Sequence, residues 1–249
     1  MNILFLGGFY PFYHFTRLPI PGKHDHDGDL ASAAFVFPIV GLIVGALLAL
    51  VWWITSLALP PALASGLTIA AGLLLTGALH EDGFSDCADG LGGGHSKERA
   101  LEIMRDSRIG AYGAAALIVT IGLRWFALAE FDIIAGIAAL LIAHMASRTS
   151  IIIALATSNY ARDKGLGSSV ASGSTLQTWI IASIVCLLLG VVIGGAAAIV
   201  ACLLAFLISW LFLKYLENRL GGYTGDGLGA MQQISEIVVL LTLTGFWVV

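Results

Sequence analysis

The densest cluster of ionisable residues in the chain runs from His80 to Gly90 and is rich in carboxylates. Asp82, Asp86 and Asp89 stand at positions i, i+4 and i+7, so on a helix they share one face. Like charges at this spacing repel each other, and no Lys or Arg lies between them. Carboxylate oxygens suit Mg²⁺, which takes one or two carboxylates together with water and phosphate oxygens. The cluster therefore predicts a Mg²⁺ site; the alternative interpretation is a solvated acidic helix end.

Two further acids could complete such a site. Asp106 lies between Arg105 and Arg108, which are candidates for holding a phosphate. Asp226 lies in a glycine-rich stretch after Thr224, where glycine would let the backbone approach a ligand closely. The alternative for that stretch is a linker with a turn aspartate. Acids and arginines in this combination suit phosphoryl transfer, in which metal and cationic groups neutralise developing charge.

Three more basic residues stand in positions of interest. Lys164 lies in a charged, glycine-containing segment, 162–169, that could close over a phosphate. Arg148 lies within an apolar stretch and would share a helix face with His144 at i, i+4. An ionisable group at membrane depth is a functional candidate. Arg124 also lies in an apolar stretch, and we expect it to extend toward the outer interface.

The composition indicates what must position these residues. Of the 249 residues, 58% are hydrophobic and 11% are charged, whereas soluble domains are about 25% charged. Because so small a share of charged residues cannot cover a water-facing surface, we expect an integral membrane protein in contact with the lipid bilayer. The net charge of −4 gives no general field that would attract nucleic acid.

The apolar segments predict an all-α, polytopic helical bundle in one membrane-embedded catalytic domain, 1–249. A bilayer core needs about 20 apolar residues per helix, and seven segments qualify. They are 33–57, 62–79, 112–129, 133–157, 176–193, 196–213 and 234–249. Because the last is short, the alternative is six spans with a docked C-terminal helix. Residues 1–18 are apolar and aromatic, which favours a short interfacial helix.

The basic residues orient these spans. Ten of the 12 Lys and Arg residues fall in or beside alternate connections, and the other connections, near 58–61, 130–132 and 194–195, contain none. Positive charge concentrates on the cytoplasmic side of membrane proteins. We therefore expect the N-terminus and the acidic cluster to face the cytoplasm.

The motifs together resemble those of the cobalamin synthase family, also called adenosylcobinamide-GDP ribazoletransferase. They occur in family order and cover nearly the whole chain. The matching pieces are Phe15–Pro19, Phe37-Pro38 with Gly41, His80–Gly90, Met104–Arg108 with Gly110, Gly165–Gly167 and Gly221–Ala230. Glu81 departs from the family pattern, in which we expect an apolar residue.

The resemblance implies a Mg²⁺-dependent transferase of the bacterial inner membrane. Its substrates would be adenosylcobinamide-GDP and α-ribazole or α-ribazole 5′-phosphate, with release of GMP in the last steps of nucleotide-loop assembly. We expect Asp82, Asp86, Asp89 and Asp226 as metal ligands, and these four with Asp106 as the catalytic acids. The expected substrate-binding residues are Arg17, Arg105, Arg108, Arg148, Lys164 and Thr224. Asp89 or Asp226 would accept the proton of the ribazole hydroxyl. Other enzymes of the pathway and a second copy of the chain are partner hypotheses.

Three rival functions fit part of the pattern. A CDP-alcohol phosphotransferase also has aspartates at a membrane surface, but the Ala-Arg pair that should follow its Asp-Gly is missing after Gly83. An aromatic prenyltransferase normally has two aspartate-rich motifs, whereas the second segment here has only Asp226. A transporter could use His144 and Arg148, but most of the charge lies at one membrane face rather than at the midplane.

Overall fold

The computed structural model describes residues 15–18, 34–162 and 174–249, and its regular structure there is helical. The prediction for Lys164 and most of the predicted interfacial helix lie outside these residues. The elements are η1 Ala34–Val36, α3 Phe37–Ser56, α4 Pro61–Thr76, α5 Leu79–Gly93, α6 Lys97–Ile103, α7 Ala111–Ala129, α8 Ile133–Ser150, α9 Ile152–Thr157, α10 Leu176–Leu220 and α11 Gly225–Trp247.

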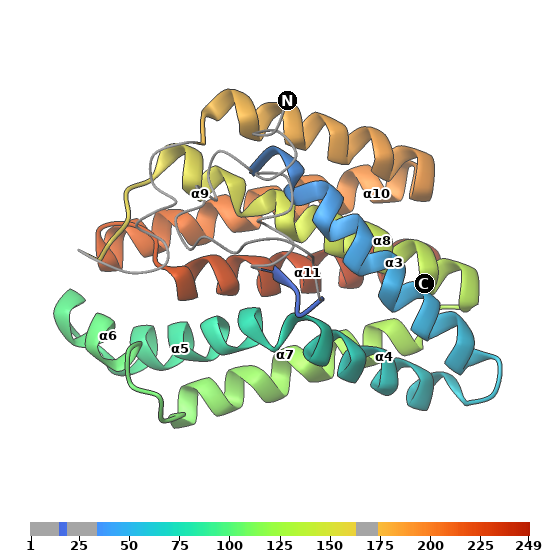
Figure 1. Cartoon of the computed structure of the whole chain (residues 1–249), viewed down its shortest axis with the longest axis horizontal. Coiled ribbons are helices and arrows are strands. Elements are labelled where there is room, and N and C mark those ends of the chain that lie inside the picture. Colours follow the sequence, from blue (N-terminus) through green and yellow to red (C-terminus); the bar gives the residue numbers. More distant parts are fainter. Residues whose placement is uncertain (1–14, 19–33, 163–173) are drawn as a thin grey trace.

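The helices are gathered in one bundle (Figure 1) and have the length and apolar composition of membrane-spanning segments. Five segments are long and apolar enough to cross a bilayer, and the bent pair of α4 and α5 would make a sixth. Large apolar side chains such as Leu74, Ile118 and Val192 are exposed on the outside of the bundle. A continuous apolar exterior would be unfavourable in water but matches lipid chains.

The 45-residue helix α10 consists of two helices that meet at Gly195. This residue has φ 63° and ψ −147°, and the chain doubles back there (Figure 1). A methyl group added to Gly190 would lie 3.7 Å from the Sγ of Cys202. On a straight helix, residues 12 positions apart would be about 18 Å apart. The predicted break at Gly194-Gly195 is therefore confirmed.

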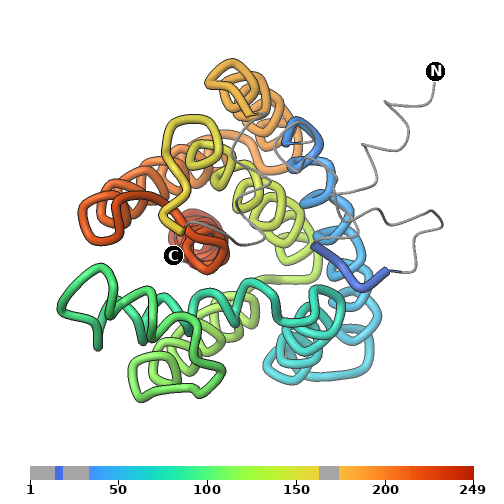
Figure 2. The backbone as a smooth tube through the Cα atoms, turned by 60° about the vertical axis from the view of Figure 1, so that its left-hand side comes forward, coloured from blue at the N-terminus to red at the C-terminus, as the bar shows by residue number. Residues whose placement is uncertain are grey.

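The helix α11 lies in the middle of the bundle, where it contacts α5, α7, α8 and α10 (Figure 2). It begins at Gly225, well before the predicted segment 234–249. The Oγ1 of Thr224 accepts a hydrogen bond from the Gly227 amide, and this N-cap starts the helix early. The glycine-rich stretch is thus helical from Gly225 onward, and its alternative interpretation as a linker is wrong there.

A sharp turn between α4 and α5 places the acidic helix inside the bundle. The two helix axes differ by 90°. Gly77 and Ala78 both have positive φ values, 66° and 56°, and for alanine this left-handed conformation costs roughly 1–2 kcal/mol. The predicted segment 62–79 therefore ends at Thr76, and α5 runs along α7 and α11 toward α6.

Candidate active site

The acidic run forms a helical face, as its spacing predicts. Asp82, Asp86 and Asp89 all lie on α5. Asp82 is exposed, Asp86 is half-buried and Asp89 is buried. Within the described residues, the side chains of Asp82 and Asp86 have no hydrogen-bond or ion-pair partner. Their oxygens are therefore available to a ligand.

Asp89 has a different environment, because its carboxylate caps the start of α7. Its Oδ2 accepts a hydrogen bond from the Gly110 amide at 2.7 Å, and its Oδ1 accepts one from the Gly113 amide at 2.8 Å. Added methyl groups at these two glycines would lie within 2.4 Å of the carboxylate oxygens. Gly110 and Gly113 thus form a cradle for Asp89, which satisfies amides that a helix N-terminus leaves without partners.

The start of α11 packs closely against α5 and brings Asp226 to the acidic face. A methyl group on Gly83 would lie 3.0 Å from the Cα of Asp226, and one on Gly229 would lie 3.1 Å from the His80 carbonyl oxygen. Small residues allow this close approach between membrane helices. Asp86 interacts electrostatically with Asp82, Asp89 and Asp226. Four carboxylates from two helices therefore gather in one region.

Arg162 is the cation at this site that the sequence interpretation did not assign. Its Nη2 lies 2.6 Å from Oδ2 of Asp226. The segment that carries Arg162 is held beside α11 by two backbone hydrogen bonds: the Ala161 amide donates to the Tyr223 carbonyl at 2.8 Å, and the Tyr223 amide donates to the Asn159 carbonyl at 2.9 Å. Burial raises the pKa of Tyr223 to about 12, so its hydroxyl stays neutral.

The donor set fits a Mg²⁺ ion that is completed by its substrate. Among the described residues, no three His, Cys, Asp or Glu side chains converge closely enough to hold a metal ion by themselves. Mg²⁺ usually binds through one or two carboxylates, with waters and substrate phosphates completing its six ligands. The unpartnered carboxylates of Asp82 and Asp86, with Asp226 facing them, meet that requirement.

Asp106 and Arg108 form an exposed pair in the turn between α6 and α7. The Nη2 of Arg108 lies 2.6 Å from Oδ2 of Asp106, and the Nε donates to Oδ1 at 3.0 Å. These hydrogen bonds lower the pKa of Asp106 to about 2. Arg105 is also exposed here. Asp89, Asp106, Arg108 and Tyr112 line a cavity of about 420 Å³, which falls within the size range of ligand pockets.

Three predicted substrate-binding residues already have contacts within the protein. The side chain of Arg17 covers Gly77 at the α4–α5 turn, and its amide donates to the Leu75 carbonyl. Thr224 is fully buried and its hydroxyl caps α11. Arg148 is also fully buried, and its Nη1 lies 3.2 Å from Nδ1 of His144. The predicted pairing of Arg148 with His144 is thus confirmed.

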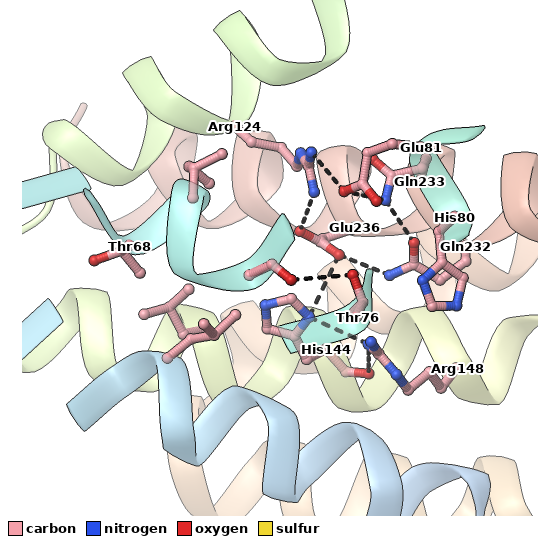
Figure 3. Close-up of a pocket in the computed structure, with 14 residues that line it drawn as sticks. Thr68, Thr76, His80, Glu81, Arg124, His144, Arg148, Gln232, Gln233 and Glu236 are labelled. Carbon is pink, nitrogen blue, oxygen red and sulfur yellow. Dashed lines mark hydrogen bonds and ion pairs between the residues drawn. The ribbon is translucent and has the colours of Figure 1, made fainter. Parts of the chain in front are cut away.

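Arg124 belongs to a buried polar network (Figure 3). Its Nη2 lies 2.9 Å from Oε1 of Glu81 on α5, and its Nη1 lies 3.1 Å from Oε1 of Glu236 on α11. With 5% of its surface exposed, Arg124 does not extend to the outer interface, and that prediction is wrong. The two acids hold the guanidinium inside because an unpaired charge there would be far more costly.

Four further residues extend this network into the bundle (Figure 3). The Gln232 amide donates to Oε2 of Glu236 at 2.7 Å, and the Gln233 amide donates to Oε1 of Glu81 at 3.2 Å. The Nδ1 of His144 lies 3.4 Å from Oε2 of Glu236. Together with Arg148 these side chains line a cavity of about 20 Å³, which is room for one water molecule.

Comparison with known proteins assigns the chain to a protein family. A family model described as cobalamin-5-phosphate synthase matches residues 9–244. The chain belongs to this family. Family membership confirms the resemblance seen in the motifs and decides against the lipid phosphotransferase, prenyltransferase and transporter interpretations.

Relatives of the family are similar over nearly their whole length, and each is named adenosylcobinamide-GDP ribazoletransferase. The protein of Ralstonia nicotianae is 45% identical over 237 residues, which cover 92% of this chain and 91% of the relative. That of Bradyrhizobium diazoefficiens is 43% identical over 237 residues, 93% and 90% of the two chains. That of Shewanella amazonensis is 38% identical over 243 residues, 94% and 92%. No solved structure matches this chain.

Proposed function

We propose that this chain joins adenosylcobinamide-GDP to α-ribazole or its 5′-phosphate and releases GMP. Its relatives' shared name supports the substrates. The observation that carries the proposal is a pair of carboxylates, Asp82 and Asp86, which have no side-chain partner among the described residues and face the Asp226–Arg162 ion pair. Transfer from a diphosphate needs a divalent metal and cationic side chains around the phosphates. Asp82 and Asp86 offer metal ligands, and Arg162 is a cationic side chain in the same region.

In the proposed reaction, a hydroxyl oxygen of the ribazole bonds to the phosphorus that carries the corrinoid. The bond from that phosphorus to the bridging oxygen breaks, and GMP leaves with the electron pair. Asp82 and Asp86 would hold Mg²⁺, which would supply charge neutralisation on the diphosphate when bound. Asp226 is the better acceptor for the hydroxyl proton, because both oxygens of Asp89 already accept backbone hydrogen bonds.

The test is turnover by the purified protein in lipid vesicles. Adenosylcobinamide-GDP, Mg²⁺ and α-ribazole 5′-phosphate are supplied, and GMP and corrinoid products are followed by chromatography. We expect equal amounts of GMP and cobalamin 5′-phosphate, and no product after EDTA treatment. A folded protein that yields neither product with α-ribazole or with its phosphate would refute the proposal.

We also propose that the chain crosses a bacterial inner membrane seven times with its active site in the cytoplasm. The hairpin of α10 and the bent α4–α5 pair support this number of crossings, and the basic connections support the direction. Figure 1 shows α6 at one end of the bundle and the α3–α4 connection at the other. The native cysteines are buried. A membrane-impermeant maleimide should therefore label Glu98→Cys from the cytoplasmic side and Glu130→Cys from the opposite side. Labelling of both from one side would contradict the proposed topology.

A further inference from the structure

The ion pairs of Arg124 join the two helices that carry the exposed acids of the active site. One arm of the guanidinium holds Glu81, the residue before Asp82 on α5, and the other holds Glu236 on α11. Building on the proposed function, we propose that Arg124 is a positioning residue. It fixes α5 against α11 and so sets the separation of Asp82 and Asp86 from Asp226.

The helices need such a link because their contact near the active site is made by backbone and glycine. Gly83 lies against the Asp226 backbone, and Gly229 lies against the His80 backbone. Such contacts allow close approach. One direct side-chain link, the hydrogen bond from the Gln233 amide to Oε1 of Glu81 at 3.2 Å, also joins the two helices, but a hydrogen bond from a neutral donor resists sliding less than buried ion pairs do. A slide of one helical turn, about 5.4 Å, would separate Arg124 from at least one of its two partners.

The chemistry of the network makes that separation costly. Glu81, Arg124 and Glu236 are all nearly fully buried, so a broken pair would leave a charge without a partner in an apolar interior. The two negative charges of Glu81 and Glu236 are balanced by the two positive charges of Arg124 and Arg148. Arginine suits the central place because its planar fork holds two carboxylates in a fixed geometry, which the point charge of lysine cannot do.

Arg124 would act only through its partners, since with 5% of its surface exposed it has no access to a substrate at the acidic face. The role also gives a function to Glu81, the carboxylate that directly precedes Asp82 in the acidic motif. Its side chain points to Arg124 and Gln233 rather than joining the exposed acids (Figure 3). Reacting groups misplaced by 1 Å can lose roughly 100-fold in rate, so a link this far from the chemistry has a measurable effect.

The test compares Arg124→Lys with the natural protein in lipid vesicles by two measurements. The first is the Mg²⁺ concentration that gives half-maximal GMP release. The second is backbone hydrogen exchange of α5 and of the first turns of α11. Because lysine keeps the charge but not the fork, we expect the half-activating Mg²⁺ concentration to rise about 10-fold and turnover to fall roughly 10- to 100-fold. Exchange should accelerate in α5 and α11 and remain unchanged in α3.

A matched control separates positioning from general stability. Trp52→Phe removes a buried hydrogen bond from Trp52 Nε1 to the Ile133 carbonyl, 3.1 Å long, which joins α3 to the start of α8. This variant should leave the Mg²⁺ response and the exchange of α5 and α11 unchanged. If Arg124→Lys does not fold, the comparison is made with Arg124→Met combined with Glu81→Gln, which removes one charge of each sign.

The proposal is overturned if the Arg124 variant keeps either the natural Mg²⁺ response or the natural exchange of α5 and α11, or if Trp52→Phe changes both equally. The exchange measurement needs no turnover. A chain that released no GMP would therefore refute the proposed function, whereas unchanged exchange of α5 and α11 in the Arg124 variant would refute this inference.

Discussion

Arg162 and Asp226 form an ion pair in which the Nη2 of the arginine lies 2.6 Å from Oδ2 of the aspartate. The pair joins the segment after α9 to the first turn of α11, near Asp82 and Asp86 of α5, whose carboxylates have no partner in the part of the chain that the structure describes. Both side chains are more than three-quarters buried. An arginine in this position can neutralise Asp226 in the resting protein and offer its other nitrogens to a phosphate oxygen.

Arg162→Gln should therefore lower GMP release by roughly 100-fold, in the range found when one charge-stabilising donor is removed. The KM for adenosylcobinamide-GDP should rise as well, because the arginine would contact the diphosphate in the bound state. Lys214→Gln is the matched control, since Lys214 is also paired with a carboxylate, that of Glu217, but is half-exposed on α10. Steady-state kinetics of both variants check the prediction, and equal losses in the two would contradict it.

The cradle around Asp89 predicts different outcomes for two glycines of α7. A methyl group at Gly113 would lie 2.3 Å from Oδ2 of Asp89 and 2.4 Å from Oγ of Ser85, whereas one at Gly122 would meet nothing within 4 Å. Gly113→Ala should destabilise the protein by about 1–3 kcal/mol and reduce turnover. Gly122→Ala should be neutral or stabilising by up to about 1 kcal/mol. The unfolding temperatures of the two variants in one detergent test the prediction. A Gly113→Ala variant as stable as the natural protein would show that Asp89 does not cap α7.

Asp106 provides a prediction about pH. Its hydrogen bonds with Arg108 lower its pKa from 3.8 to about 2, so the folded state favours the ionised form. The stabilisation that ionised Asp106 gives the folded state is complete above about pH 4 and is lost as the pH falls toward 2. Asp106 therefore stays ionised in any ordinary assay, and an acidic limb of the rate profile above about pH 4 must come from another group. The pH dependence of kcat/KM should keep its shape in Asp106→Asn; disappearance of the limb would contradict the assignment.

Much of the fold could be predicted from the sequence, because long apolar segments identify membrane-spanning helices. The segments 33–57, 112–129 and 133–157 agree with the helices to within a residue or two at each end. The break between the two helices of α10 at Gly194-Gly195 was also predicted from the sequence. The early start of α11 was not, since glycines typical of a loop instead serve close packing on α5 once Thr224 has capped the helix.

The candidate site was predictable where it depends on local spacing and not where it depends on packing. The common helix of Asp82, Asp86 and Asp89 follows from spacing alone. That Asp89 turns to the amides of Gly110 and Gly113 requires knowing that α7 starts beside α5. Arg124 resembled a residue extending to the interface because its partners, Glu81 and Glu236, lie far away in the sequence.

The central claim is that the free acids of α5 bind the metal on which phosphoryl transfer depends. Asp82→Asn and Asp86→Asn each test it, with Asp132→Asn as control. Asp132 caps α8 by accepting a hydrogen bond from the Ala135 amide, and asparagine caps a helix about as well as aspartate.

The decisive measurement is GMP release from adenosylcobinamide-GDP across a range of Mg²⁺ concentrations. Both α5 variants should lose at least about 100-fold in turnover and require more Mg²⁺, while Asp132→Asn keeps the natural rate. Near-natural turnover in Asp82→Asn and Asp86→Asn, at the same Mg²⁺ concentration, would contradict the account.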